Sequence, residues 1–174
     1  MRNRLSALPD RSVATLRKLR RRLSREWRAL APPNVIRAAL AALDSNAAPK
    51  WFVYELLHHH EAAMRKLSPV HVKRLGRGLD GWGEVDPFAL YISGPAWRDG
   101  RITDAHVHAW ARSRDRWWRR VAVVSTVPLN SGGRSPEIER TLAVCDLVKG
   151  DRDDMIEKAL SWALRTLAVA WRAL

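Results

Sequence analysis

The sequence has one cysteine and no long uninterrupted apolar stretch. Cys145 by itself cannot form an intrachain disulfide, and a zinc site built on thiolates would lack ligands. Nowhere do roughly 18 uncharged apolar residues follow one another, and the apolar stretch near the start is far shorter than a signal peptide needs. These absences predict a soluble cytoplasmic protein that is neither exported nor bound to a membrane.

Acidic residues are also scarce. The 174 residues include 31 Lys and Arg but only 18 Asp and Glu, so the formal net charge is +13. Ten of the basic side chains lie within the first 28 residues. Such an excess suits a polyanion better than a small acidic substrate, and nucleic acid is therefore the favoured partner, ahead of a membrane surface.

Clean alternation of β-branched and polar residues is missing, whereas apolar residues recur at spacings of three and four from end to end. This pattern predicts an all-α protein. Prolines, glycines and serines separate the expected helices. These helices cover 12–30, 33–44, 49–62, 68–77, 87–94, 103–112, 115–127, 136–148 and 151–172.

Prolines mark several of the helix starts, because a proline in the first turn loses no hydrogen bond. Ser68, Asp86 and Ser135 precede three of these prolines and are predicted N-caps. Helix pairs begin near residues 12, 49 and 86, a spacing of roughly 37 that is close to TPR and HEAT-type repeats. We therefore predict one domain over 1–174, with a flexible basic arm at 1–11. Its fold would be a right-handed solenoid of antiparallel helix pairs with a concave basic face.

The segment SRDRWWRRVAVVS (113–125) combines an apolar and a basic face. The apolar face is predicted to be core: Trp117, Val121 and Val124. Three arginines lie on the other side: Arg116, Arg119 and Arg120. Guanidinium groups clustered in this way could bind phosphate oxygens, although a solvated charged face explains the pattern equally well.

In the segment 151–172, Trp162 projects well away from the apolar face and lies beside Lys158 and Arg165. An indole in this position either packs against a neighbouring helix or offers a flat surface to a ligand.

The stretch GLDGWGEVDPF (78–88) places carboxylates next to a tryptophan and a proline. The structural interpretation is that Asp86 caps a helix starting at Pro87 while Trp82 tucks into the loop. The functional interpretation is that a capping position holds the Asp86 carboxylate rigidly at the edge of a cleft. Between the two carboxylates, Asp86 is the favoured functional residue and Glu84 a bystander.

The histidines do not suggest a metal site. His58, His59 and His60 are adjacent, and neighbouring helical residues point about 100° apart, so they cannot converge on one ion. No glycine-rich phosphate loop or nucleophile motif is present. We expect neither a metal nor a cofactor.

Three segments together resemble the AlkD-type family of DNA alkylation repair proteins: GWGEVD (81–86), DRWWRRVAVVS (115–125) and IEKALSWALR (156–165). The resemblance extends over roughly 12–171. It implies HEAT-like repeats and a DNA glycosylase that removes N3- and N7-alkylated purines from duplex DNA without flipping the lesion into a tight pocket. Matching motifs imply four site residues: Trp82, Asp86, Arg120 and Trp162.

In the implied mechanism, Asp86 stabilises the oxocarbenium ion that forms on the deoxyribose and positions the attacking water. Trp82 and Trp162 would offer their π faces to the cationic sugar, and Arg120 would grip a backbone phosphate and support the charge of Asp86. The expected DNA-binding residues are Arg116, Arg119, Arg120, Lys158 and Arg165.

Two other hypotheses remain open. The chain could be a non-catalytic binder of branched or damaged DNA on the same fold, or a helical-repeat scaffold for an acidic protein. We expect a monomer that binds double-stranded DNA.

Overall fold

The computed structural model describes residues 4–5, 10, 12–133 and 135–172, and every regular element in these ranges is a helix. The all-α prediction is therefore confirmed. The chain divides into two compact units, Met1–Arg77 and Gly78–Leu174. The right-handed solenoid and its concave basic face stay predictions. None of the helices within the described ranges has both the length and the apolarity that crossing a membrane requires.

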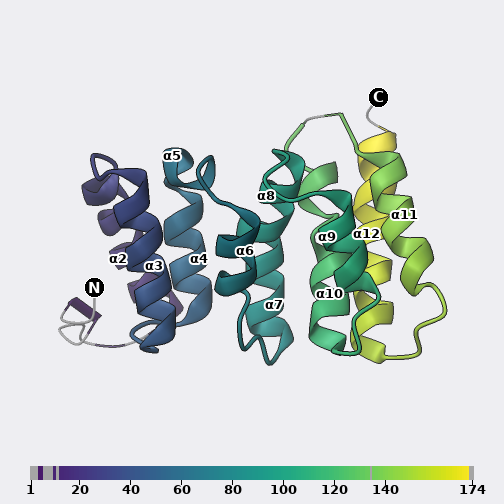
Figure 1. Cartoon of the computed structure of the whole chain (residues 1–174), viewed down its shortest axis with the longest axis horizontal. Helices are drawn as coiled ribbons and strands as arrows, with labels where there is room; N and C mark the ends of the chain where they lie inside the picture. The colour runs from purple at the N-terminus through teal and green to yellow at the C-terminus, as the bar shows by residue number, and fades with distance from the viewer. Residues whose placement is uncertain (1–3, 6–9, 11, 134, 173–174) are drawn as a thin grey trace. The chain divides into compact units, whose positions relative to one another are not determined.

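The first unit is a small helical cluster (Figure 1). Its helices are α2 (Val13–Trp27), α3 (Pro32–Asp44), α4 (Lys50–His58), α5 (Glu61–Met64) and α6 (Pro69–Leu75). Helix α4 packs against α2, α3 and α5, and α3 also contacts α5 and α6. One core cluster of this unit contains Leu5, Leu16, Leu19, Leu23, Phe52 and Leu56.

Helix α2 separates its apolar and basic residues cleanly. Leu16, Leu19 and Leu23 recur every three or four residues and are buried. The opposite side carries exposed cations, which are called the α2 basic stripe below: Lys18, Arg21, Arg25 and Arg28. Within the described residues, no ion pair joins a member of this stripe to a carboxylate.

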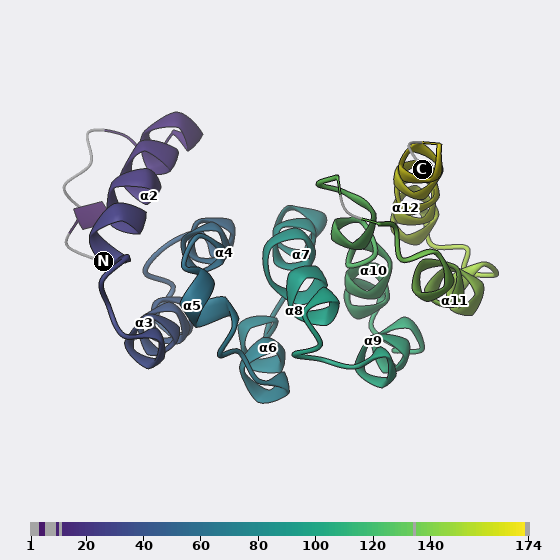
Figure 2. The same ribbon diagram turned by 90° about the horizontal axis from the view of Figure 1, so that it is seen from above.

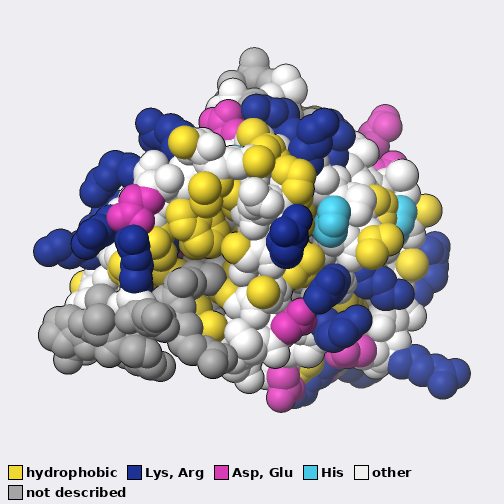
Figure 3. Space-filling view, turned by 60° about the vertical axis from the view of Figure 1, so that its left-hand side comes forward, with side chains coloured by type: hydrophobic (Ala, Val, Ile, Leu, Met, Phe, Trp, Pro, Cys, Tyr) yellow, Lys and Arg dark blue, Asp and Glu magenta, His cyan; other side chains and the backbone are white. Residues whose placement is uncertain are grey.

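Lysine and arginine side chains stand at several places on the face drawn in Figure 3, with apolar side chains and some carboxylates between them. Most of the predicted arm at 1–11 lies outside the described residues. Within it, Leu5 is buried in the first unit's core and Arg4 pairs with Glu26.

The second unit carries the candidate site. Its elements are α7 (Trp82–Phe88), the π-helix η1 (Ala89–Ser93), α8 (Gly94–Arg98), α9 (Asp104–Ala111), α10 (Arg116–Val124), the 3-10 turn η2 (Pro128–Asn130), α11 (Ile138–Val148) and α12 (Asp154–Trp171). Figure 2 shows α7, α10 and α12 along one side of this unit and α9 and α11 along the other. Helix α10 contacts α7, α9, α11 and α12 and is therefore central.

The expected helix at 87–94 begins earlier and ends later than predicted. Helical structure is continuous over 82–98, with Gly81 as N-cap and Pro87 inside α7. The prediction that Asp86 caps a helix starting at Pro87 is therefore wrong. The first turn forms upstream because buried Val85 and Phe88 anchor it and the Glu84 carboxylate accepts a hydrogen bond from the Asp80 backbone N–H at 3.2 Å. Pro87 cannot donate to the carbonyl of Gly83, and the π-helix follows directly.

Two other expected boundaries change. Ser135 does not cap α11, whose N-cap is Glu137, because the Asn130 side chain accepts from the Glu137 N–H at 3.0 Å and holds the preceding loop. The expected helix 49–62 is divided into α4 and α5, with His60 capping α5. The Ser68 cap is confirmed: together with His71 it forms a capping box at the start of α6.

An aromatic cluster fixes α10 between α7 and α9. The ring of Trp118 lies 6.1 Å from Phe88 of α7 and 5.1 Å from Trp110 of α9. Val121 and Val124 are fully buried, as predicted, whereas Trp117 is only partly buried and has the Arg116 guanidinium 4.6 Å from its ring centroid. This packing sets the relative position of α7 and α10.

Gly94 allows a close approach between α8 and the end of α10. A Cβ atom at this position would lie 2.8 Å from the Ala89 carbonyl, the Ser125 carbonyl and the Pro128 ring. The hydroxyls of Ser93 and Ser125 meet at 2.7 Å in the same buried contact. Only a residue without a side chain fits here.

We predict that Gly94→Ala lowers the free energy of unfolding by about 1 to 3 kcal/mol, because backbone atoms have to move to admit the methyl group. Urea unfolding followed by far-UV circular dichroism measures the change. The matched control is Gly83→Ala, where a Cβ meets nothing within 4 Å and helix propensity favours alanine. Equal stability of Gly94→Ala and the wild type would contradict the close contact.

Candidate functional site

Helix α7 presents Trp82 and Asp86 on one side. The two residues are four apart, so they lie one above the other on the helix surface. Trp82 is the first residue of the helix and is 61 % exposed, so the expectation that it tucks into the loop is wrong. The Asp86 side chain is 15 % exposed. An exposed indole therefore lies one turn from a largely buried carboxylate.

Arg120 of α10 holds that carboxylate in a bidentate pair. Its Nε donates to Oδ1 of Asp86 and its Nη2 to Oδ2, both at 2.8 Å. Its Nη1 donates to the carbonyl oxygen of Met155 in α12. The Arg120 side chain is only 8 % exposed. All three guanidinium nitrogens thus have protein partners, and the carboxylate plane of Asp86 is fixed.

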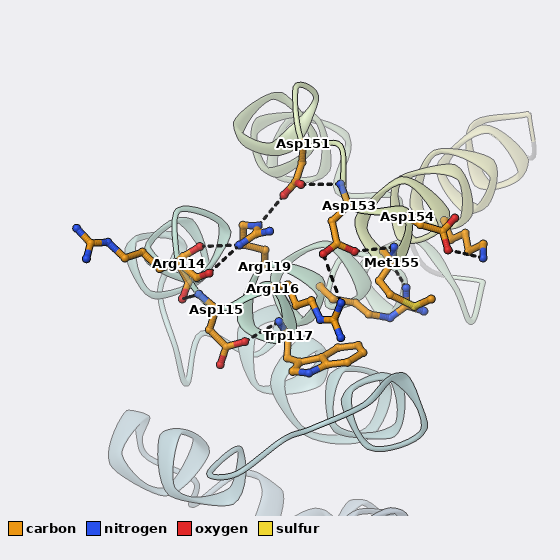
Figure 4. Close-up of polar contacts among 12 residues, drawn as sticks. Arg114, Asp115, Arg116, Trp117, Arg119, Asp151, Asp153, Asp154 and Met155 are labelled. Atoms are coloured by element: carbon orange, nitrogen blue, oxygen red, sulfur yellow. Dashed lines mark hydrogen bonds and ion pairs between the residues drawn. The ribbon is translucent and has the colours of Figure 1, made fainter.

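The other two arginines of α10 also pair with acids (Figure 4). The Nε of Arg119 lies 2.6 Å from Oδ2 of Asp151, and its Nη1 donates to the carbonyls of Ser113 and Arg114 at 3.1 Å. Arg116 is more exposed and lies 3.8 Å from Asp153. These contacts bind α10 to the start of α12, so Arg119 mainly has a structural role here.

The acids before α12 form a connected turn. Asp153 caps α12 by accepting from the Met155 N–H at 2.9 Å, and Asp151 accepts from the Asp153 N–H at 3.0 Å. Burial by itself would raise the pKa of Asp151, but hydrogen bonds from the Asp153 N–H and from Arg119 outweigh it, and the pKa lies below its usual value. Asp151 therefore stays charged and paired with Arg119 at neutral pH.

Helix α12 carries the remaining predicted residues. Lys158 is exposed and forms an ion pair with Asp154 at 2.6 Å, one turn away. Trp162 is partly buried and, with Arg165, lines a cleft beside the loop that follows η2. Within the described residues, no hydrogen bond or ion pair joins Trp162 to Asp86 or Arg120. The structure therefore brings Asp86, Arg120 and Trp82 together on two helices and puts Trp162 on a third.

Some contributing groups were missed by sequence reasoning. The Met155 carbonyl carries no sequence signal, since any residue supplies one. In the sequence, Asp151 and Asp153 are only acids near the start of an expected helix, and Trp110 and Trp118 are only apolar residues. Asp151 and Arg119 are more than thirty residues apart in the sequence, so the sequence does not indicate that they meet.

The titratable side chains most typical of metal or nucleophile sites have other partners. In the described ranges, no three side chains of His, Cys, Asp or Glu are grouped so that they could hold a metal ion. His71 and His106 complete capping boxes at the starts of α6 and α9. Burial, followed by the nearby Asp146 charge, raises the pKa of the Cys145 thiol to about 11, which keeps it protonated at neutral pH.

The described part of the chain therefore offers a rigid carboxylate, an adjacent exposed indole and an excess of cations, without a nucleophile motif. No curated protein and no solved structure matches the chain significantly. The family model for the DNA alkylation repair enzyme matches residues 12–172, which include every predicted site residue. The chain belongs to the DNA alkylation repair enzyme family.

Proposed function

We propose that the protein is a monofunctional DNA glycosylase that hydrolyses the N-glycosidic bond of N3- or N7-alkylated purines in duplex DNA. The observation that carries the proposal is the Asp86 carboxylate, held on both oxygens by Arg120 one helical turn from the exposed Trp82. This arrangement belongs to a member of a DNA alkylation repair family, which supplies the substrate class.

The proposed hydrolysis requires little from the protein beyond a negative charge held beside the sugar. An alkylated purine is cationic, so it leaves with the electron pair of the C1′–N bond and becomes neutral without a general acid. Positive charge develops on the deoxyribose as the bond breaks, and a preorganised carboxylate stabilises it electrostatically. A water molecule held by Asp86 then adds to C1′ and gives its proton to that carboxylate, as in glycoside hydrolysis.

Each of the other site residues has a role in this proposal. The indoles of Trp82 and Trp162 face the cationic sugar, and each contributes on the order of 1 kcal/mol where it is partly desolvated. Arg120 acts chiefly as a positioning residue, because its nitrogens already donate to Asp86 and Met155. Arg165 and the exposed Arg116 contact backbone phosphates.

The α2 basic stripe supports binding of a duplex. Its four cations repeat at spacings of three, four and three residues along one side of α2, so they form a row of positive charge that faces solvent. A row of this kind attracts a phosphate backbone and releases counterions when it binds.

One observation favours a second candidate, a non-catalytic binder of damaged or branched DNA. Both oxygens of Asp86 accept hydrogen bonds from Arg120, and a carboxylate engaged in this way has less charge to offer a sugar cation. Excision and binding measured on the same preparation separate the two candidates.

We predict that Asp86→Asn slows the release of 7-methylguanine from methylated duplex DNA by at least about 100-fold, because the transition state loses its counter-charge. Single-turnover excision assays measure the rate. The matched control is Glu84→Gln, which retains an oxygen to accept from the Asp80 N–H and is expected to keep the wild-type rate within about threefold. A folded, DNA-bound wild type that releases no base would overturn the enzyme and leave the binder.

Arg120→Lys tests the positioning role. One ammonium group cannot make two parallel hydrogen bonds, so we expect the excision rate to fall about tenfold and the free energy of unfolding by about 1 to 3 kcal/mol. DNA affinity at fixed salt should change little, since Arg120 is buried. Arg116→Lys, at an exposed arginine on the same helix, serves as the control. Unchanged excision in Arg120→Lys would show that the bidentate geometry is not required.

We predict that Lys18→Gln, Arg21→Gln and Arg25→Gln together weaken DNA binding and make its salt dependence shallower by about 1 in slope per side chain that contacts a phosphate. Fluorescence anisotropy at several salt concentrations measures both. The control triple is Arg65→Gln, Arg74→Gln and Lys149→Gln, in which each cation already pairs with a carboxylate. Equal effects of the two triples would mean that net charge alone matters.

A further inference from the structure

Hydrogen bonds connect Arg119 of α10 to the first turn of α12 (Figure 4). The Nε of Arg119 lies 2.6 Å from Oδ2 of Asp151, whose Oδ1 accepts from the Asp153 N–H at 3.0 Å. Oδ1 of Asp153 in turn accepts from the Met155 N–H at 2.9 Å. These four residues are called the turn network below. The network fixes the position of Met155 relative to α10.

The Met155 carbonyl extends this constraint to the site. It accepts a hydrogen bond from Nη1 of Arg120, whose Nε and Nη2 donate to the two oxygens of Asp86 at 2.8 Å. A bidentate pair by itself fixes the guanidinium and the carboxylate relative to each other but lets them shift as a unit. The carbonyl adds a third point of contact, so the position of Met155 influences where the Asp86 carboxylate lies.

Arg119 is well placed to anchor the turn network. Its side chain is only 20 % exposed and that of Asp151 only 15 %, so water competes little for their ion pair. The Nη1 of Arg119 also donates to the carbonyls of Ser113 and Arg114 at 3.1 Å, which ties the guanidinium to the loop before α10. Asp151 joins this anchored arginine to the turn before α12.

The nearby acid Asp154 lies outside the turn network. Its side chain is exposed and pairs with Lys158 at 2.6 Å, one turn further along α12. Asp151 and Asp154 carry the same charge and are three residues apart, so replacing either one by asparagine changes the net charge equally. A difference between the two variants therefore reports the network rather than charge near the DNA.

We propose that Asp151 is a positioning residue for the Asp86 carboxylate. Paired with Arg119, it holds the turn that carries Met155, and the Met155 carbonyl sets the direction of Arg120. The inference rests on the proposed glycosylase function. A catalytic group has to be held to within about 0.5 Å of its productive position. A loosened turn should therefore slow the reaction while leaving the surface that contacts DNA intact.

The test measures single-turnover excision of 7-methylguanine at saturating protein, together with the Kd for the same duplex. We expect Asp151→Ala to slow excision about tenfold and to change the Kd less than about threefold. Asp151→Asn retains an oxygen for the Asp153 N–H but loses the charged contact to Arg119, so we expect a loss of about threefold. The control, Asp154→Asn, should excise within about twofold of the wild-type rate.

A double-mutant cycle with Arg120→Lys separates positioning from a general structural role. Arg120→Lys already removes the bidentate pair, so adding Asp151→Ala should slow excision by less than about twofold more. All four proteins are compared at a temperature at which circular dichroism shows them to be folded. Where Asp151→Ala does not fold, Asp151→Asn takes its place in the cycle. Losses that multiply fully would overturn the inference, as would excision by the Asp151 variant at the wild-type rate.

A second readout needs no excision. The Nε–H of Arg120 is buried and donates to Asp86, so it should exchange slowly with water and give a distinct ¹H–¹⁵N signal. Loss of one such signal in Arg120→Lys assigns it. We expect this signal to shift or broaden in Asp151→Ala and to keep its position in Asp154→Asn. An unchanged signal in Asp151→Ala contradicts a link between the turn network and the pair.

The outcomes separate this inference from the proposed function. A wild type that excises alkylated bases, together with an Asp151→Ala variant that excises them equally fast, removes the inference alone. A folded, DNA-bound wild type that excises none removes the glycosylase and the catalytic part of the inference. The Arg120 signal then decides whether Asp151 positions the pair.

Discussion

The bidentate pair between Asp86 and Arg120 is the interaction on which the site depends. It joins α7 to α10, and the third guanidinium nitrogen ties both to the Met155 carbonyl at the start of α12. Burying two charges costs several kcal/mol of desolvation, and a well-packed apolar pair of similar volume is often as stable. The pair is therefore better explained by orientation than by stability: it holds one carboxylate in one plane next to an exposed indole.

Pairing between arginines and carboxylates also determines which cationic side chains can attract a polyanion. The arginines of α10 each face an acid, Asp86, Asp151 or Asp153, so much of their charge is neutralised within the second unit. The α2 basic stripe has no such partners within the described residues. The positive charge behind the net charge of +13 is therefore neutralised by acids at some cationic side chains and not at others. In the proposed function, binding to DNA and holding the Asp86 carboxylate would therefore fall to different arginines.

Helix α12 contributes to two neighbouring parts of the second unit. The start of α12 supplies the carbonyl that fixes Arg120, and its second half lines the cleft beside the Gly132–Gly133 loop.

Most of the helices follow from the sequence, because apolar periodicity and local caps depend on near neighbours. Ser68 illustrates this: its capping box needs only His71, three residues away. The prediction failed at Asp86, where the local rule of an acid before proline pointed to a helix start. Phe88 packs edge-on to Trp118, which comes thirty residues later, and this contact together with buried Val85 makes the earlier start favourable. Gly81 is the N-cap of this helix, and Glu84 accepts a hydrogen bond from the Asp80 N–H just before it.

The sequence by itself determined the all-helical class, the excess of positive charge and the candidate residues, since composition and periodicity express these directly. Only the tertiary structure decided what each residue does. Arg116, Arg119 and Arg120 look alike in sequence, yet one is exposed, one anchors a turn and one is buried against a carboxylate. The reason is physical: a side chain's role depends on the burial and charge of partners that lie far away in the chain, and packing alone brings those partners into contact.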